Sequence, residues 1–143
     1  MSSMSENGRM ILYCDGASRG NPGPASVGAA LFREGEDEPR ECISRAIGRA
    51  TNNVAEYSSL IDGLKKALDI GCADIEIRMD SELAVKQIRG EYRVKNENLR
   101  PLYEEARALL ERFKRWKIQH IPRNRNSLAD RLANEALDGK PLS

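Results

Sequence analysis

Residues 11–24 of the chain are Ile11-Leu12-Tyr13-Cys14-Asp15-Gly16-Ala17-Ser18-Arg19-Gly20-Asn21-Pro22-Gly23-Pro24. The opening apolar run is rich in strand formers, is too short for a helix, and ends on the carboxylate Asp15. A segment made almost entirely of turn residues follows, and its three glycines allow the backbone to approach a ligand closely. We therefore predict a strand that ends at Asp15, next to a loop suited to ligand binding.

The length of 143 residues and the 40% hydrophobic content predict one domain with a substantial core. We expect this domain to span residues 10–138, between flexible tails at 1–9 and 139–143. No apolar run approaches the ~18 residues that a membrane span needs, so we expect no membrane partner. Three cysteines without metal-like spacing favour reduced thiols, and we expect a cytoplasmic monomer.

The net charge of +1 conceals an uneven distribution of charge along the chain. Residues 1–83 carry a net charge of −5, residues 84–125 carry +7, and residues 126–143 carry −1. Charged, solvated helix faces would explain this distribution without any ligand. The alternative is a phosphate-binding flank beside an acidic metal site.

The hydrophobic pattern predicts an α/β fold with a mixed five-stranded sheet flanked by helices. Short spacings between the first three strands favour an antiparallel meander, and alternating helices and strands follow. We expect the segment 51–53 (Thr51-Asn52-Asn53) to supply helix-capping residues, with Asn53 and Glu56 spaced as in a capping box. We expect Ser81 to cap a short helix and Ser127 to cap the last helix. The expected strands are 9–15, 26–33, 41–46, 73–79 and 116–121, and helices are expected to begin near residues 53, 82, 99 and 128.

Four carboxylates lie at the ends of these predicted elements: Asp15, Glu56, Asp80 and Asp130. Each has an ordinary explanation on its own, as a turn acid, a cap or a charge at a helix start. If the four converge, they must repel one another unless cations compensate them. Oxygen-rich sites suit Mg²⁺ or Mn²⁺, and two such ions can act together on a phosphodiester. The sequence therefore indicates a site for two Mg²⁺ ions, with Mn²⁺ as a substitute.

Four motifs in order resemble the signature of the ribonuclease H type 1 family, over about residues 10 to 137. They are residues 15–24 (DGASRGNPGP), 51–56 (TNNVAE), 79–81 (MDS) and 129–134 (ADRLAN). The resemblance implies the ribonuclease H-like fold with strand order 3-2-1-4-5, in which strands 1–3 are antiparallel. It also implies two-metal hydrolysis of the RNA strand of RNA–DNA hybrids, with 5′-phosphate and 3′-hydroxyl products.

The resemblance also implies a role for each acid. Asp15 would bind both metal ions, Glu56 and Asp80 would hold the ion on the nucleophile side, and Asp130 would hold the other. Glu56 would also meet a ribose 2′-hydroxyl, the group that distinguishes RNA from DNA. The matching substrate-contact positions are Gly16, Asn21, Asn52, Asn53 and Ser81.

Three departures from the family pattern affect the expected site. The loop before Asp130 is short and lacks the family's histidine, so we expect Arg123 to contact the leaving group or phosphate. We interpret His120 as a structural residue of the last strand. Glu82 stands where a neutral amide commonly contacts substrate. No long basic handle is present, so hybrid binding would depend on Lys86, Arg89, Arg93 and Lys95.

Three alternatives remain open at this stage. The simplified basic region could permit cleavage of double-stranded RNA as well. A non-catalytic hybrid-binding module is a second alternative, which the presence of all four acids disfavours. An integrase-like relative with the same fold is a third, and the Asn-Pro-Gly and Thr-Asn-Asn segments argue against it.

Overall fold

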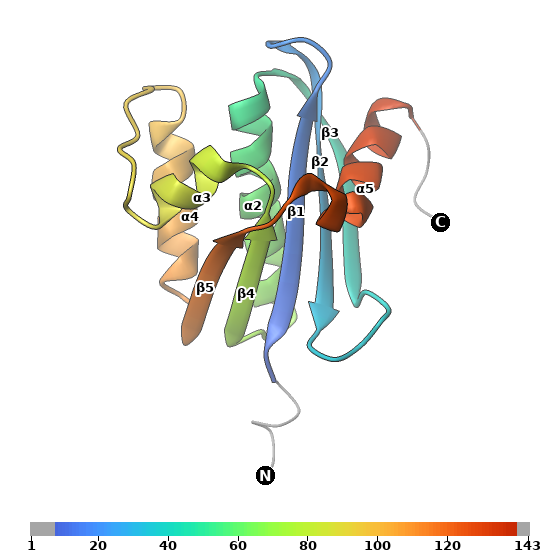
Figure 1. The fold of residues 1–143 in the computed structure, drawn as a ribbon, viewed down its shortest axis with the longest axis vertical. Coiled ribbons are helices and arrows are strands. Elements are labelled where there is room, and N and C mark those ends of the chain that lie inside the picture. The colour runs from blue at the N-terminus through green and yellow to red at the C-terminus, as the bar shows by residue number, and fades with distance from the viewer. Residues whose placement is uncertain (1–7, 140–143) are drawn as a thin grey trace.

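The structure, a computed structural model, describes residues 8–139. Residues 1–7 and 140–143 of the expected tails lie outside the described residues. The strand order β3-β2-β1-β4-β5 confirms the predicted mixed sheet (Figure 1). Its strands are β1 (Met10–Ser18), β2 (Gly23–Arg33), β3 (Glu41–Ala50), β4 (Asp74–Met79) and β5 (Arg115–His120).

Pairing within the sheet follows the predicted pattern. The pairs β1–β2 and β2–β3 are antiparallel, whereas β4 runs parallel to both β1 and β5. The helical elements are α2 (Asn52–Asp69), α3 (Glu82–Ile88), α4 (Arg100–Leu110), the 3₁₀ turn η1 (Arg123–Arg125) and α5 (Ser127–Leu137). No helix among the described residues is long and apolar enough to cross a membrane.

The first strand does not end at Asp15, as the sequence pattern had predicted. It continues to Ser18 because β2 pairs with it along its whole length, with Asp15 opposite Gly28. What ends at this point is the pairing with β4, since Cys14 and Met79 form the last register pair. Asp15 is therefore the first residue of β1 whose edge β4 leaves uncovered.

Two details of the predicted helix caps are wrong. Within the predicted segment 51–53, Thr51 rather than Asn53 caps α2, and its hydroxyl accepts a hydrogen bond from the amide of Val54. The residue at the cap position of α5 is Asn126 rather than Ser127, and its side chain makes no capping bond. The predicted cap at Ser81 is confirmed, because its hydroxyl accepts from the amide of Ala84.

Helices α2 and α5 pack on opposite faces of the sheet (Figure 1), and a glycine lies beneath each. A Cβ on Gly16 would overlap the backbone of Ala55 and Glu56 in α2. A Cβ on Gly28 would overlap the carbonyl of Ala129 in α5. The backbones thus approach more closely than any side chain would permit. These contacts place the start of α2 on β1 and the start of α5 on β2, on either face of the sheet beside the Asp15–Gly28 pair.

The contact at Gly28 predicts the stability of two variants. Gly28→Ala should lose about 1–3 kcal/mol of unfolding free energy because the new methyl group overlaps the α5 backbone. Gly28→Val should lose more. Strand propensity alone predicts the opposite order, because valine favours strands. Denaturant unfolding of the two variants and the wild type measures the effect, and a Gly28→Val protein as stable as wild type would contradict the close packing.

Candidate active site

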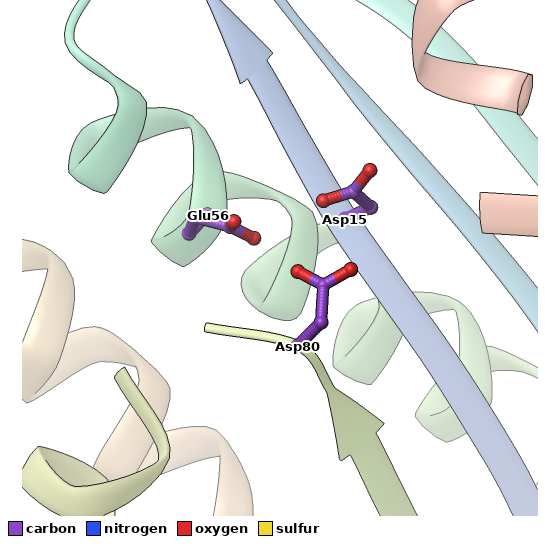
Figure 2. A group of neighbouring side chains, drawn as sticks. All are labelled: Asp15, Glu56 and Asp80. Atoms are coloured by element: carbon purple, nitrogen blue, oxygen red, sulfur yellow. The ribbon is translucent and has the colours of Figure 1, made fainter. Parts of the chain in front are cut away.

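Three of the predicted carboxylates lie together. Asp15, Glu56 and Asp80 each offer an oxygen, and these three oxygens lie within 4.8 Å of one another. Figure 2 shows the side chains converging from β1, from α2 and from the chain just after β4. Asp15 is 1% exposed, and the other two are partly buried.

The sheet register explains how the cluster forms. Asp15 and Asp80 directly follow the register pair Cys14 and Met79 on neighbouring parallel strands, so both carboxylates occur at the same level. Glu56 lies in the first half of α2, and its Oε1 accepts a hydrogen bond of 3.0 Å from the Gly16 amide. This bond replaces the predicted capping box, because it directs Glu56 toward β1 instead of toward its own helix end.

Asp130 approaches Asp15 from the α5 side and does not belong to the group of three. Its Oδ1 lies 3.6 Å from Arg123 Nη2 and accepts a 3.3 Å hydrogen bond from Asn134 Nδ2. Asn134 also donates to the main-chain carbonyl of Asp130 at 2.9 Å. One oxygen of Asp130 is therefore held by neighbouring donors.

Burial and mutual repulsion change the acidity of the cluster. Burial raises the pKa of Asp15 to about 8, with further contributions from Asp80 and Asp130. Burial also raises the pKa of Glu56 well above its usual range, and the charges of Asp15 and Asp80 add to this. Asp15 and Glu56 are costly to ionise together, because no cation among the described residues forms an ion pair with either of them.

Asp15 Oδ2 is buried and has no hydrogen-bond partner among the described residues. A buried carboxylate oxygen without a donor is rare unless an ion or water completes its surroundings. The donor set contains only carboxylate oxygens, which suits hard divalent cations such as Mg²⁺ or Mn²⁺ better than zinc. The residues present therefore fit a divalent-metal site.

Arg123 and His120 occupy different surroundings. His120 lies in β5, as predicted, although the strand ends at His120 rather than at Ile121, and its side chain is exposed. The side chain of Arg123, in η1, is 77% exposed, and its positive charge offsets a small part of the rise in the pKa values of Asp15 and Glu56. The charge of Arg123 thus acts on the cluster, and its 3.6 Å contact with Asp130 is a loose, solvent-screened one.

The residues predicted to contact substrate beside the acids lie around the same end of the sheet. The Asn21 side chain accepts from the Asn52 amide at 3.1 Å and joins the β1–β2 turn to the start of α2. Asn53 is exposed in the first turn of α2, and Ser81 follows Asp80 directly. Gly16 uses its amide to hold Glu56.

The four basic residues predicted to contact the hybrid differ in whether other residues of the chain already bind their side chains. Lys86 forms an ion pair with Glu82 at 3.0 Å, and Arg89 donates to the main-chain carbonyl of Ile118 at 3.1 Å. Arg93 and Lys95 are exposed on the connector between α3 and α4. Structural contacts therefore already engage the first two side chains.

The sequence patterns did not single out Asn126, which the structure places beside the cluster. Its side chain is 1% exposed and donates to the main-chain carbonyl of Cys14 at 2.8 Å and to Asp80 Oδ2 at 3.3 Å. In the sequence it lies among polar and basic residues of a predicted loop. No periodicity distinguishes it there from exposed Asn124.

Comparisons with known proteins agree with this geometry. A family described as "Reverse transcriptase-like" matches residues 13–136. Ribonuclease HI of Halobacterium salinarum is 49% identical over 138 residues, which cover 92% of this chain and 65% of that protein. The crystal structure of RNase H1 from this archaeon superimposes with a TM-score of 0.89 at 50% identity, covering 92% of this chain and 99% of that one. The chain belongs to the ribonuclease H type 1 family.

Two further relatives of this ribonuclease H chain are informative. LC11-RNase H1, solved in complex with an RNA/DNA hybrid, has a TM-score of 0.86 at 38% identity and covers 91% of this chain and 97% of that one. A bifunctional protein of Mycobacterium tuberculosis is 45% identical over 135 residues, or 94% of this chain but 37% of that protein. The chain thus spans 37% of the mycobacterial relative and 65% of the archaeal one.

The raised pKa of Asp15 gives a testable pH dependence. The pKa of Asp15 is about 8 in the folded protein and near 4 in the unfolded chain. The folded protein therefore loses stability as the pH rises from about 4 to about 8, because ionising Asp15 is harder in the folded state. Asp15→Asn should therefore stabilise the metal-free protein, by on the order of 1–2 kcal/mol at pH 8 and by less at pH 5. Unfolding curves in chelator at both pH values measure the difference.

The exposed residue Asp69 provides the matched control, since Asp69→Asn removes a carboxylate outside the cluster. The Asp69→Asn variant should show no comparable pH-dependent gain in unfolding free energy. An Asp15→Asn protein that is less stable than wild type at pH 8 would show that the Asp15 charge is compensated within the folded chain.

Proposed function

We propose that the chain is a metal-dependent endonuclease that hydrolyses the RNA strand of RNA–DNA hybrids and leaves 5′-phosphate and 3′-hydroxyl ends. The observation that carries this proposal is the convergence of Asp15, Glu56 and Asp80 in a chain of the ribonuclease H type 1 family. The hybrid bound by LC11-RNase H1 supports the choice of substrate. A non-catalytic binder would gain nothing from holding these carboxylates at such an electrostatic cost.

In the proposed site, two Mg²⁺ ions, or Mn²⁺ in their place, would stabilise charge on the attacking and leaving oxygens of the phosphodiester. Asp15 would bind both ions, Glu56 and Asp80 would hold one of them, and Asp130 would hold the other. Glu56 would also accept from the ribose 2′-hydroxyl and so select RNA. Arg123 would contact the leaving group or the phosphate.

The proposed substrate contacts fall into two groups around this centre. Backbone and amide groups near the acids would contact the hybrid beside the cut, and cations beyond α3 would contact phosphates. The first group comprises Gly16, Asn21, Asn52, Asn53 and Ser81, and the second comprises Lys86, Arg89, Arg93 and Lys95. Since Lys86 and Arg89 already have partners, we propose that Arg93 and Lys95 contribute most of the phosphate binding.

We also propose that the protein acts in the cytoplasm as a monomer, in a domain that spans residues 10–138. The cysteines Cys14, Cys42 and Cys72 are free, as expected where thiols remain reduced.

Cleavage of labelled duplexes tests the proposed function. The wild type with Mg²⁺ should cut the RNA strand of a hybrid and leave double-stranded DNA intact. Chelator should abolish cleavage, and Asp80→Asn should lower it by about 10²–10³-fold while hybrid binding remains. Asp69→Asn serves as the matched control and should cleave normally.

Three results of this assay would change the proposal. Hybrid binding without metal-dependent cleavage would favour a binding module. Cleavage of DNA duplexes would reject the proposed function. Cleavage of double-stranded RNA at a rate similar to that of the hybrid would extend the substrate class.

The same assay compares Arg123 with His120. Arg123→Ala should lower turnover by about tenfold, because its charge acts on Asp15 and Glu56 and it lies 3.6 Å from Asp130 Oδ1. His120→Ala should change turnover less, since His120 lies in β5. Equal or reversed losses would assign the proton-transfer or product-release step to His120.

A further inference from the structure

Asn126 joins the elements that carry three of the four acids. Its amide donates to the carbonyl of Cys14, the residue before Asp15, and to Asp80 Oδ2. Its main-chain carbonyl accepts from the Asp130 amide at 3.1 Å. The buried side chain of Asn126 therefore contacts β1 and the residue after β4, and its main chain begins the hydrogen bonding of α5.

The hydrogen bonding of Asn126 is one-sided. Both side-chain hydrogen bonds use Nδ2 as the donor, whereas Oδ1 is buried without a partner among the described residues. A buried acceptor without a donor lowers the stability of the fold. A residue present for packing alone would be better replaced by an apolar side chain. The donating amide is therefore the feature that needs an explanation.

We propose that Asn126 is a positioning residue that fixes the orientation of the Asp80 carboxylate for metal binding. Its N–H group holds Oδ2 and restricts rotation of Asp80, so the carboxylate is ordered before an ion arrives. A neutral amide suits this task, because a lysine or arginine at the same place would compensate the charge that attracts the ion. This inference rests on the proposed function of the same site.

The structure offers a matched comparison two residues away. Asn124 has the same side chain in the same short segment but is exposed, and among the described residues its side chain makes no hydrogen bond. Asn126→Ala and Asn124→Ala therefore remove the same atoms, inside and outside the site. Asn126→Ser provides a second, smaller change that retains one hydroxyl donor.

Calorimetric titration of Mn²⁺ into each full-length variant, without nucleic acid, tests the proposal. Asn126→Ala should weaken Mn²⁺ binding by about tenfold, the range found when a residue behind a metal ligand is lost. Asn126→Ser should give a smaller loss, and Asn124→Ala should bind like wild type. Circular dichroism at the titration temperature verifies that each variant is folded. If Asn126→Ala is unfolded, Asn126→Ser decides the question.

A double-mutant cycle shows whether Asn126 acts through Asp80. In an Asp80→Asn background, the Asn126→Ala change should cause no further loss of Mn²⁺ affinity. In activity assays, Asn126→Ala should raise the Mg²⁺ concentration for half-maximal cleavage and leave the hybrid KM within about twofold of wild type.

A purely structural role predicts a different pattern. The folded Asn126 variants would then melt at lower temperature but bind Mn²⁺ as tightly as wild type, and this result would overturn the proposal. Equal losses in the wild-type and Asp80→Asn backgrounds would also overturn it. A wild type that binds Mn²⁺ but cleaves no hybrid would refute the proposed function alone, because the calorimetric comparison does not use the substrate.

Discussion

The whole site depends on how closely two helices approach the neighbouring strands β1 and β2. Gly16 and Gly28 leave no side chain between the sheet and the backbones of α2 and α5, which lie on opposite faces. These contacts also position Glu56 and Asp130, because each lies in the part of its helix that packs directly against a glycine. Main-chain packing in this region therefore determines the arrangement of charges, and the charges do not determine the packing.

The second constraint is that β4 ends early. Beyond the Cys14–Met79 pair, the edge of β1 is uncovered, and an acid from the α2 side can meet Asp15 and Asp80 there. The resulting cluster is unfavourable on its own, because burial and mutual repulsion oppose ionisation of Asp15 and Glu56. Such local cost is typical of sites that a ligand completes, and the rest of the fold compensates for it.

The sequence predicted much of this arrangement, and its failures have physical causes. Hydrophobic periodicity predicted the five strands. The strand order and the meeting of Asp15, Glu56 and Asp80 were predictable because four ordered motifs resemble those of the ribonuclease H type 1 family. The continuation of β1 past Asp15 was not, because pairing with β2 overrides the turn-forming composition of residues 16–18. The burial and contacts of Asn126 were not predictable, because its side-chain amide donates hydrogen bonds to residues 46 and 112 positions away in the chain.

The account as a whole claims that divalent ions occupy the space between Asp15, Glu56 and Asp80. Anomalous diffraction from crystals soaked in Mn²⁺ measures this directly, because it locates the ions independently of any assay. The account predicts a strong peak in contact with oxygens of these three carboxylates, and a second peak between Asp15 and Asp130 when hybrid is present. Saturating Mn²⁺ with no peak at the three carboxylates would contradict it.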